Sequence, residues 1–213
     1  LHHAHGLAAH DGTPLSVVHR DVSPQNVFIT YSGLVKLVDF GIAKVDDGSV
    51  ETRIGTFKGK VAYMAPEQAL GDHVDRRADV FACGVVLHEL LTGTRFWGGL
   101  TEAVIASKLA SCELPRVESA LSSLAPEIRA IVARATAPDR DARYASAEAM
   151  LSDVEAALGA HGARQLSREL ARLVSEAFAA ERIELDRFIT TQLVKHERGE
   201  RLSPRTSLAG VTF

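Results

Sequence analysis

The most apolar stretch of the chain predicts a helix that is buried on nearly every side. From position 80 onwards, residues 75–92 carry apolar side chains around most of the helical circumference, and a helix of that kind is surrounded by protein. Gly93 follows directly and is a residue type that commonly ends helices. We therefore expect residues 75–92 to form the central helix of the fold.

Apolar residues spaced three and four positions apart predict further helices, and two short apolar runs predict strands. The strands are residues 27–29 and 35–38, and Ser32-Gly33 between them favours a tight turn. The chain is therefore expected to be mainly α-helical, with a helical bundle around the central helix and one short β-hairpin. The other helices are expected at residues 1–10, 101–110, 126–137 and 146–158, with two more after Gly162.

Composition and charge narrow the classes of partner. The 213 residues are 46% hydrophobic, which suffices for a sizeable core. A formal net charge of −3 without a long block of one sign argues against nucleic acid as a partner. Cys83 and Cys112 match neither a disulfide framework nor a zinc site, which favours a cytoplasmic setting. The apolar run at residues 80–91 is shorter than the about 20 residues of a membrane span, so no membrane contact is expected.

Three short motifs occur in order around the predicted hairpin. They are His19-Arg20-Asp21 with Asn26 shortly after it, Asp39-Phe40-Gly41, and Ala65-Pro66-Glu67. Phosphoryl transfer needs a group that accepts a proton and oxygen ligands that hold Mg²⁺. Asp21 suits the first role, and Asn26 and Asp39 suit the second, because the hairpin would bring these two side by side.

On these motifs, residues 1–160 resemble the C-terminal lobe of a bacterial, eukaryotic-like serine/threonine protein kinase, which has an α+β fold. Residues 19–26 and 59–68 carry most of the resemblance. It implies transfer of the γ-phosphoryl group of ATP to serine or threonine hydroxyls of protein substrates. ATP and Mg²⁺ would be held by Asn26 and Asp39, with Asp21 as the catalytic base.

The resemblance also implies residues that support the catalytic loop, namely His19, Phe40, Gly41, Glu67, Asp79 and Arg143. Asp79 would cap the loop backbone, Glu67 would pair with Arg143, and His19 would pack against Phe40. Arg20 would gather a phosphate on the activation loop through charge-assisted hydrogen bonds. The candidate phosphorylation sites are Thr52 and Thr56.

The sequence contains no glycine-rich loop, strand lysine or helix glutamate of the kind that holds ATP phosphates in kinases. The resemblance implies that this N-terminal lobe belongs to the same full-length chain, and that the present chain alone is inactive or very weak. The alternative is a non-catalytic scaffold or interaction module derived from a kinase. Residues 161–198 would be a helical extension and residues 199–213 a flexible tail or linker. Within the extension, residues 164–197 either pack on the lobe or bind a partner.

Two positions depart together from the family pattern. Ser23 stands where most serine/threonine kinases have lysine, and Lys60 stands where they usually have threonine. We therefore expect Lys60 to reach across the site and supply the cation that Ser23 lacks, with the Ser23 hydroxyl as its hydrogen-bond partner. The alternative is a solvated Lys60 and a Ser23 that only fills a turn. Gln25 differs from the arginine found nearby in tyrosine-specific relatives, which favours serine or threonine as the acceptor.

Four histidines cluster near the start of the chain, at His2, His3, His5 and His10. Their spacing suggests a metal site, but no nearby cysteine or acidic residue completes a ligand set. We therefore expect these histidines to lie on the surface of the first helix.

Overall fold

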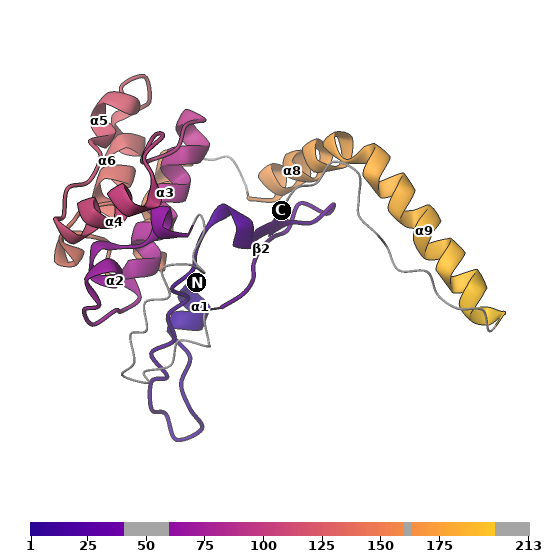
Figure 1. Cartoon of the computed structure of the whole chain (residues 1–213). Helices are drawn as coiled ribbons and strands as arrows, with labels where there is room; N and C mark the ends of the chain where they lie inside the picture. The colour runs from indigo at the N-terminus through magenta and orange to yellow at the C-terminus, as the bar shows by residue number, and fades with distance from the viewer. Residues whose placement is uncertain (41–59, 160–162, 199–213) are drawn as a thin grey trace. The chain divides into compact units, whose positions relative to one another are not determined.

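The structure is a computed structural model that describes residues 1–40, 60–159 and 163–198 (Figure 1). The chain divides into two compact units. The first consists of Leu1–Phe28 and Lys36–Ala160, and the second of Ile29–Val35 and His161–Phe213. The predictions made for Gly41, Thr52, Thr56 and the tail at residues 199–213 fall outside the described residues.

Helix α3 (Arg77–Thr92) is the centre of the first unit and lies close to the predicted range. Its first two turns are buried, with Val80 and Phe81 both 0% exposed. Its C-terminal end is more open, since Leu90 is 77% exposed. The expectation of burial along the whole helix is therefore wrong for the last turn, where the surrounding helices no longer cover it. Gly93 ends α3 in the left-handed conformation, with φ 65°.

The other helices of the first unit pack on α3 or on its neighbours. Helices α6 (Pro126–Ala135) and α7 (Ala147–Leu158) pack on α3 and on each other. The short helix α5 (Val117–Ala120) packs on α6, and α2 (Pro66–Leu70) packs on α4 (Glu102–Ala110). The sequence pattern did not reveal α2 and α5, because four or five residues are too few for a helical periodicity to show.

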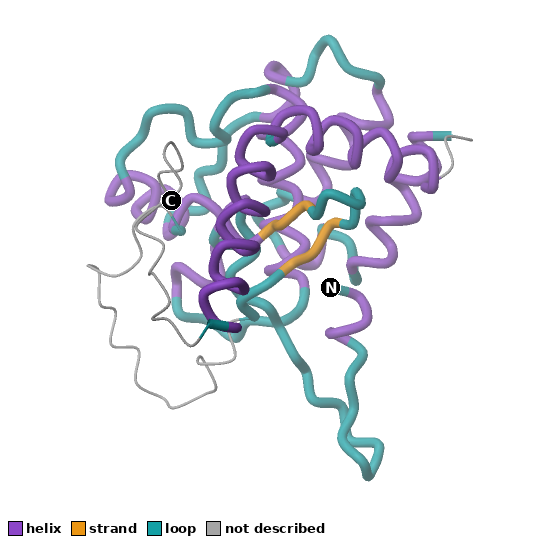
Figure 2. The backbone as a smooth tube through the Cα atoms, turned by 90° about the vertical axis from the view of Figure 1, so that its right-hand side faces the viewer, coloured by secondary structure: helices purple, strands orange, loops and turns teal. Residues whose placement is uncertain are grey.

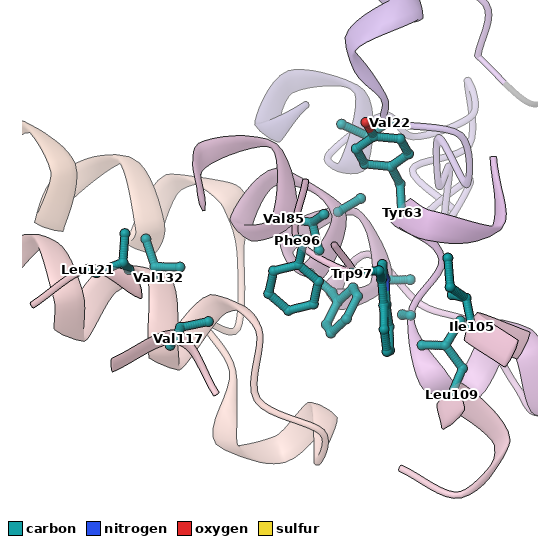
Figure 3. Packing of buried hydrophobic residues seen from close by; sticks show 14 residues of the cluster. Val22, Tyr63, Val85, Phe96, Trp97, Ile105, Leu109, Val117, Leu121 and Val132 are labelled. Atoms are coloured by element: carbon teal, nitrogen blue, oxygen red, sulfur yellow. The ribbon is translucent and has the colours of Figure 1, made fainter. Parts of the chain in front are cut away.

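Apolar side chains from these helices form the hydrophobic core (Figure 3). Phe96 and Trp97, which follow α3, meet edge to face at 5.6 Å between ring centroids. Leu109 of α4 and Val132 of α6 are both 0% exposed. Burial of such side chains from several helices holds the first unit together, at about 25 cal/mol for each Å² removed from water.

Gly84 allows α3 and α6 to approach closely. A Cβ atom at this position would lie 2.7 Å from the Cβ atom of Ala135 and 2.9 Å from Cγ2 of Thr136. Both distances are shorter than carbon atoms tolerate, so only glycine fits here. The small residues at this crossing thereby set the spacing of the two helices.

Strands β1 (Val27–Ile29) and β2 (Val35–Leu37) form a two-stranded hairpin, drawn in orange in Figure 2. The turn between them is closed by a hydrogen bond from the Gly33 amide to the Thr30 carbonyl, 2.9 Å long. Gly33 has φ 77°, which favours glycine. The 3₁₀ turn η1 (Pro24–Asn26) leads directly into β1.

The start of the chain differs from the predicted helix at residues 1–10. Helix α1 (His2–His5) is a single turn that ends at Gly6. The chain then forms an isolated antiparallel bridge between Ala8 and Pro14, in which the Ala9 amide donates to the Thr13 carbonyl over 2.8 Å. Backbone pairing across this turn replaces the helical hydrogen bonds, so the prediction was wrong beyond residue 5.

The second unit contains helices α8 (Ala163–Ala177) and α9 (Ala179–Glu197), which meet at Phe178. Both follow the predicted helical spacing of apolar residues. The guanidinium of Arg182 lies 4.9 Å from the ring centroid of Tyr31 in the hairpin turn. In the parts of the chain that the structure describes, no helix combines the length and the apolar character needed to cross a membrane.

Candidate active site

Asp79 holds the segment that contains His19-Arg20-Asp21. Its carboxylate accepts hydrogen bonds from the amides of His19 and Arg20, both 2.8 Å long, through different oxygens. Asp79 lies in the first turn of the central helix α3 and is 1% exposed. Arg20 has φ 62°, a backbone conformation that is unfavourable for a non-glycine residue. The two hydrogen bonds to a fixed carboxylate hold this strained backbone in place.

His5 also binds Asp79, which the sequence analysis did not foresee. The Nε2 atom of His5 lies 2.7 Å from Oδ2 of Asp79, and both side chains are almost completely buried. The expectation that this histidine lies on a helix surface was therefore wrong, whereas His2, His3 and His10 are exposed. The two residues are 74 positions apart, so no local pattern indicated the contact.

Asn26 fixes the carboxylate of Asp21. The Nδ2 group of Asn26 donates to the main-chain carbonyl of Asp21 over 2.8 Å and to its Oδ2 atom over 3.1 Å. Both amide hydrogens are thereby used, which leaves Oδ1 of Asn26 as the atom that can bind a cation. Asn26 is 5% exposed and sits at the end of η1, so its orientation is well defined.

His19 joins the segment that contains Asp21 to the strand that precedes Asp39. Its Nε2 atom lies 3.0 Å from the carbonyl of Val38, and its Nδ1 atom accepts a 3.3 Å hydrogen bond from the Asp21 amide. These two partners require a proton on Nε2 and none on Nδ1. The ring also contacts Phe40, with 4.4 Å between centroids.

Asp39 follows Val38 at the end of the hairpin. The Val38 amide donates to the Asn26 carbonyl over 2.9 Å, so the residue before Asp39 is bonded to Asn26. Asp39 is exposed and has φ 58°. Asp39, a predicted Mg²⁺ ligand, is thus the second residue of this region with an unfavourable backbone conformation, a feature that often occurs at functional sites.

The side chain of Lys60 reaches the carboxylate of Asp21. Its ammonium group forms an ion pair with Oδ2 of Asp21, and the Lys60 and Asp21 side chains are 39% and 18% exposed. The sequence analysis expected Ser23 as the partner instead. Ser23 is 1% exposed and its hydroxyl has no hydrogen-bond partner among the described residues. A carboxylate binds an ammonium group more strongly than a neutral hydroxyl does, which explains the different partner.

The backbone at Lys60 is anchored by residues that follow it. Lys60 precedes the 3₁₀ turn η3 (Val61–Tyr63), where Trp97 Nε1 donates to the Ala62 carbonyl over 2.9 Å. The Tyr63 hydroxyl donates to Glu89 over 2.8 Å. Burial, together with the Glu89 carboxylate, raises the pKa of Tyr63 to about 12, so this hydroxyl stays protonated as a donor at neutral pH.

Glu67 and Arg143 form a buried pair. The two guanidinium nitrogens of Arg143 lie 2.7 and 2.8 Å from the two oxygens of Glu67, and the Arg143 side chain is 0% exposed. Arg143 also donates to the carbonyls of Ala137, Pro138 and Arg77 over 2.8, 2.9 and 3.3 Å. Its remaining donors are thereby satisfied by main chain, and the start of α2 is fixed to the segment before α7.

Gln68 is a further link that the sequence analysis missed. Its Nε2 group donates to the Arg20 carbonyl over 3.2 Å, and its Oε1 atom accepts from the Ala65 amide over 3.0 Å. One side chain therefore connects α2 to the segment that contains Arg20 and Asp21. A small hollow lies at this junction, and its walls include Asp21, Lys60 and Gln68.

Among the described residues, no group of three or more histidine, cysteine or acidic side chains is placed to hold a metal ion. Oxygen atoms of Asn26 and Asp39 are the hard ligands that Mg²⁺ prefers. The donor chemistry at the hairpin therefore fits magnesium better than zinc.

Known proteins are similar to this chain in sequence and in fold. Residues 7–197 match the family described as protein kinase domain. The chain is 42% identical over 182 residues to the tyrosine-protein kinase MasK of Myxococcus xanthus, covering 85% of this chain and 28% of that protein. It is 39% identical over 151 residues to the serine/threonine-protein kinase PknL of Mycobacterium tuberculosis, covering 71% of this chain and 37% of that protein.

A solved structure shows the same fold. The twitchin kinase region from C. elegans aligns with a TM-score of 0.55 at 23% identity, covering 78% of this chain and 30% of that one. The chain thus spans well under half the length of the relatives named here. The family match covers most of the chain, including the residues around Asp21, Asn26 and Asp39. The chain therefore belongs to the protein kinase domain family.

Proposed function

We propose that this chain carries the catalytic segment of a serine/threonine protein kinase. The observation that supports the proposal most directly is the arrangement of Asp21. Asn26 orients its carboxylate through two hydrogen bonds, and Asp79 holds the backbone on its N-terminal side. Catalysis of phosphoryl transfer depends mainly on positioning and on charge stabilisation. A carboxylate held this way is suited to orient an acceptor hydroxyl.

Asp21 is proposed to take the proton of that hydroxyl while its oxygen attacks the γ-phosphorus of ATP. The bond from the γ-phosphorus to the bridging oxygen breaks, and ADP leaves with the bonding electrons. Oδ1 of Asn26 and the carboxylate of Asp39 are the proposed Mg²⁺ ligands. Mg²⁺, when bound, neutralises charge on the phosphate oxygens. The backbone bond between Val38 and Asn26 supports this pairing of ligands.

The groups that cover the ATP phosphates are proposed to come from sequence outside these 213 residues. No glycine-rich loop with a downstream strand lysine occurs in the sequence. The relatives MasK and PknL are both much longer than the segment they share with this chain. The active enzyme would then be the natural protein that contains this chain together with those groups.

The acceptor class has two candidates. Serine or threonine is favoured by Gln25, which differs from the arginine of tyrosine-specific relatives, and by the printed name of PknL. Tyrosine is favoured by the printed name of MasK, at 42% identity. Analysis of phosphorylated amino acids after incubation with labelled ATP separates the two, since phosphotyrosine as the main product would overturn the first candidate.

The proposed function is tested with Asp21→Asn in the longest natural polypeptide that contains the chain. We expect loss of phosphotransfer by at least about 100-fold, because general-base groups contribute typically 10²–10⁴-fold. Asp11→Asn is the matched control, since Asp11 is an exposed aspartate whose side chain accepts only a local hydrogen bond from the Thr13 amide. If the unaltered protein transfers no phosphate to any protein, the non-catalytic interaction module becomes the better interpretation.

A further inference from the structure

The position of Lys60 is set by the core of the first unit. Tyr63 donates its amide to the Lys60 carbonyl over 3.1 Å, which forms the turn η3. Trp97 and Glu89 then bind this turn through Ala62 and Tyr63. Because Tyr63 and Trp97 are 3% and 4% exposed, the root of the Lys60 side chain is held by buried residues.

The Asp21 carboxylate presents its two oxygens differently. Oδ2 receives both the Lys60 ammonium group and the Asn26 amide, the latter at 3.1 Å. Oδ1 therefore remains for an acceptor hydroxyl. Lys60 approaches from η3, 39 positions further along the chain, and not from the catalytic segment itself.

The catalytic segment provides no cation at position 23. Ser23 is neutral, 1% exposed and without a hydrogen-bond partner among the described residues. Among the described residues, Asp21 forms an ion pair with Lys60. A side chain that is 39% exposed keeps enough freedom to follow a substrate group that arrives beside Asp21.

We propose that Lys60 is a catalytic residue that contacts the phosphoryl group during its transfer and stabilises the negative charge on its oxygens. This inference rests on the proposed function. Oδ1 of Asp21 takes the proton of the acceptor hydroxyl, the acceptor oxygen forms its bond to phosphorus, and ADP departs with the electrons of the broken bond. A cation placed where negative charge develops lowers the barrier to transfer.

The first test measures the free protein, without ATP. Lysine side chains are acetylated with a limiting amount of acetic anhydride, and the modified positions are counted by peptide mass spectrometry. Asp21→Asn removes the ion pair and should raise the labelling of Lys60 at least about twofold, since a charge-assisted contact hinders the amine. Lys108, equally 39% exposed and paired with Glu113 at 3.0 Å, should not change. Unchanged labelling of Lys60 would overturn the contact with Asp21.

The second test measures phosphotransfer in the longest natural polypeptide that contains the chain. Lys60→Met should lower kcat at least about tenfold, with the KM for ATP changed less than about threefold, since the lost contact belongs to the transition state. Lys60→Arg should keep most of the activity, because it keeps the charge. Lys108→Met is the matched control and should leave kcat unchanged. Equal kcat for Lys60→Met and the unaltered protein would overturn the catalytic role.

Moving the charge gives the sharpest result. In the double variant Ser23→Lys with Lys60→Thr, we expect at least about a fivefold gain in kcat over Lys60→Thr alone, because the cation returns to the same site from the other segment. A midpoint of urea unfolding within the range of the single variants shows that the double variant is folded. No gain in a folded double variant would overturn the inference, as would a Lys60→Arg variant as slow as Lys60→Met. An unaltered protein without phosphotransfer would instead overturn the proposed function itself.

Discussion

Two carboxylates buried around the catalytic segment are each satisfied by fixed partners. Asp79, 1% exposed, receives two backbone amides and His5. Glu67, 6% exposed, receives both nitrogens of the Arg143 guanidinium. A buried charge without such partners is strongly destabilising. A single substitution that removes one partner should therefore lower the stability of the protein.

Arg143→Met should destabilise the protein by about 3–5 kcal/mol, because it leaves the Glu67 carboxylate buried without its partner. The measurement is the free energy of unfolding in urea. The double variant Glu67→Leu with Arg143→Met should recover part of the loss, since no unpaired charge remains. Lys108→Met breaks an exposed ion pair and should cost less than about 1 kcal/mol. A loss for Arg143→Met as small as for Lys108→Met would contradict the assigned role of the pair.

At the scale of elements, the crossing of α3 and α6 depends on the absence of a side chain at Gly84. The nearest atoms of Ala135 and Thr136 belong to the end of α6 and the residue after it. This contact sets the distance between α6 and α3, the helix that carries Asp79. The geometry of the catalytic segment therefore depends on a glycine with no chemical role.

Gly84→Ala should destabilise the protein by about 1–3 kcal/mol, because the new methyl group overfills a packed core. In an open helix the same substitution would stabilise, by about 0.4–1 kcal/mol. The sign of the change in unfolding free energy thus separates the two situations. Gly99→Ala is the control, since no atom lies within 4 Å of a Cβ added there. A stabilising Gly84→Ala would show that α6 moves away without cost.

At the scale of the whole molecule, the described residues contain the groups that we propose for one side of a phosphoryl-transfer site. Asp21, Asn26 and Asp39, the proposed base and Mg²⁺ ligands, lie within residues 7–197, which match the protein kinase domain family. The sequence provides no equivalent of the glycine-rich loop that covers the phosphates. Positioning of both reactants is the main source of rate in this chemistry, so half of the site should be a poor catalyst.

The 213-residue chain alone should therefore transfer phosphate at least about 100-fold more slowly than the longest natural polypeptide that contains it, since it lacks the groups that hold and neutralise the phosphates. Both proteins are assayed with labelled ATP and a general protein substrate, at equal concentration. The Asp21→Asn variant of the longer protein sets the background. Equal rates for the two unaltered proteins would show that this chain binds ATP productively without further sequence.

The sequence alone indicated the protein kinase family, the central helix and the hairpin. These features depend on residue type and on spacing over a few positions, where helical and strand periodicities are visible. Such patterns do not show pairing between segments of the backbone. The helix expected at residues 1–10 was therefore wrong beyond residue 5, where Ala8 pairs with Pro14.

Only the tertiary structure decided the partners of the charged and polar side chains. His5 reaches Asp79 over 74 positions, Gln68 reaches Arg20 over 48, and Lys60 reaches Asp21 over 39. Such contacts form because burial penalises an unpaired polar group wherever the packed helices bring two chain segments together. The spacing of residues along the sequence does not indicate which partner such a group will find. In the folded core, each of these groups has few partners within reach.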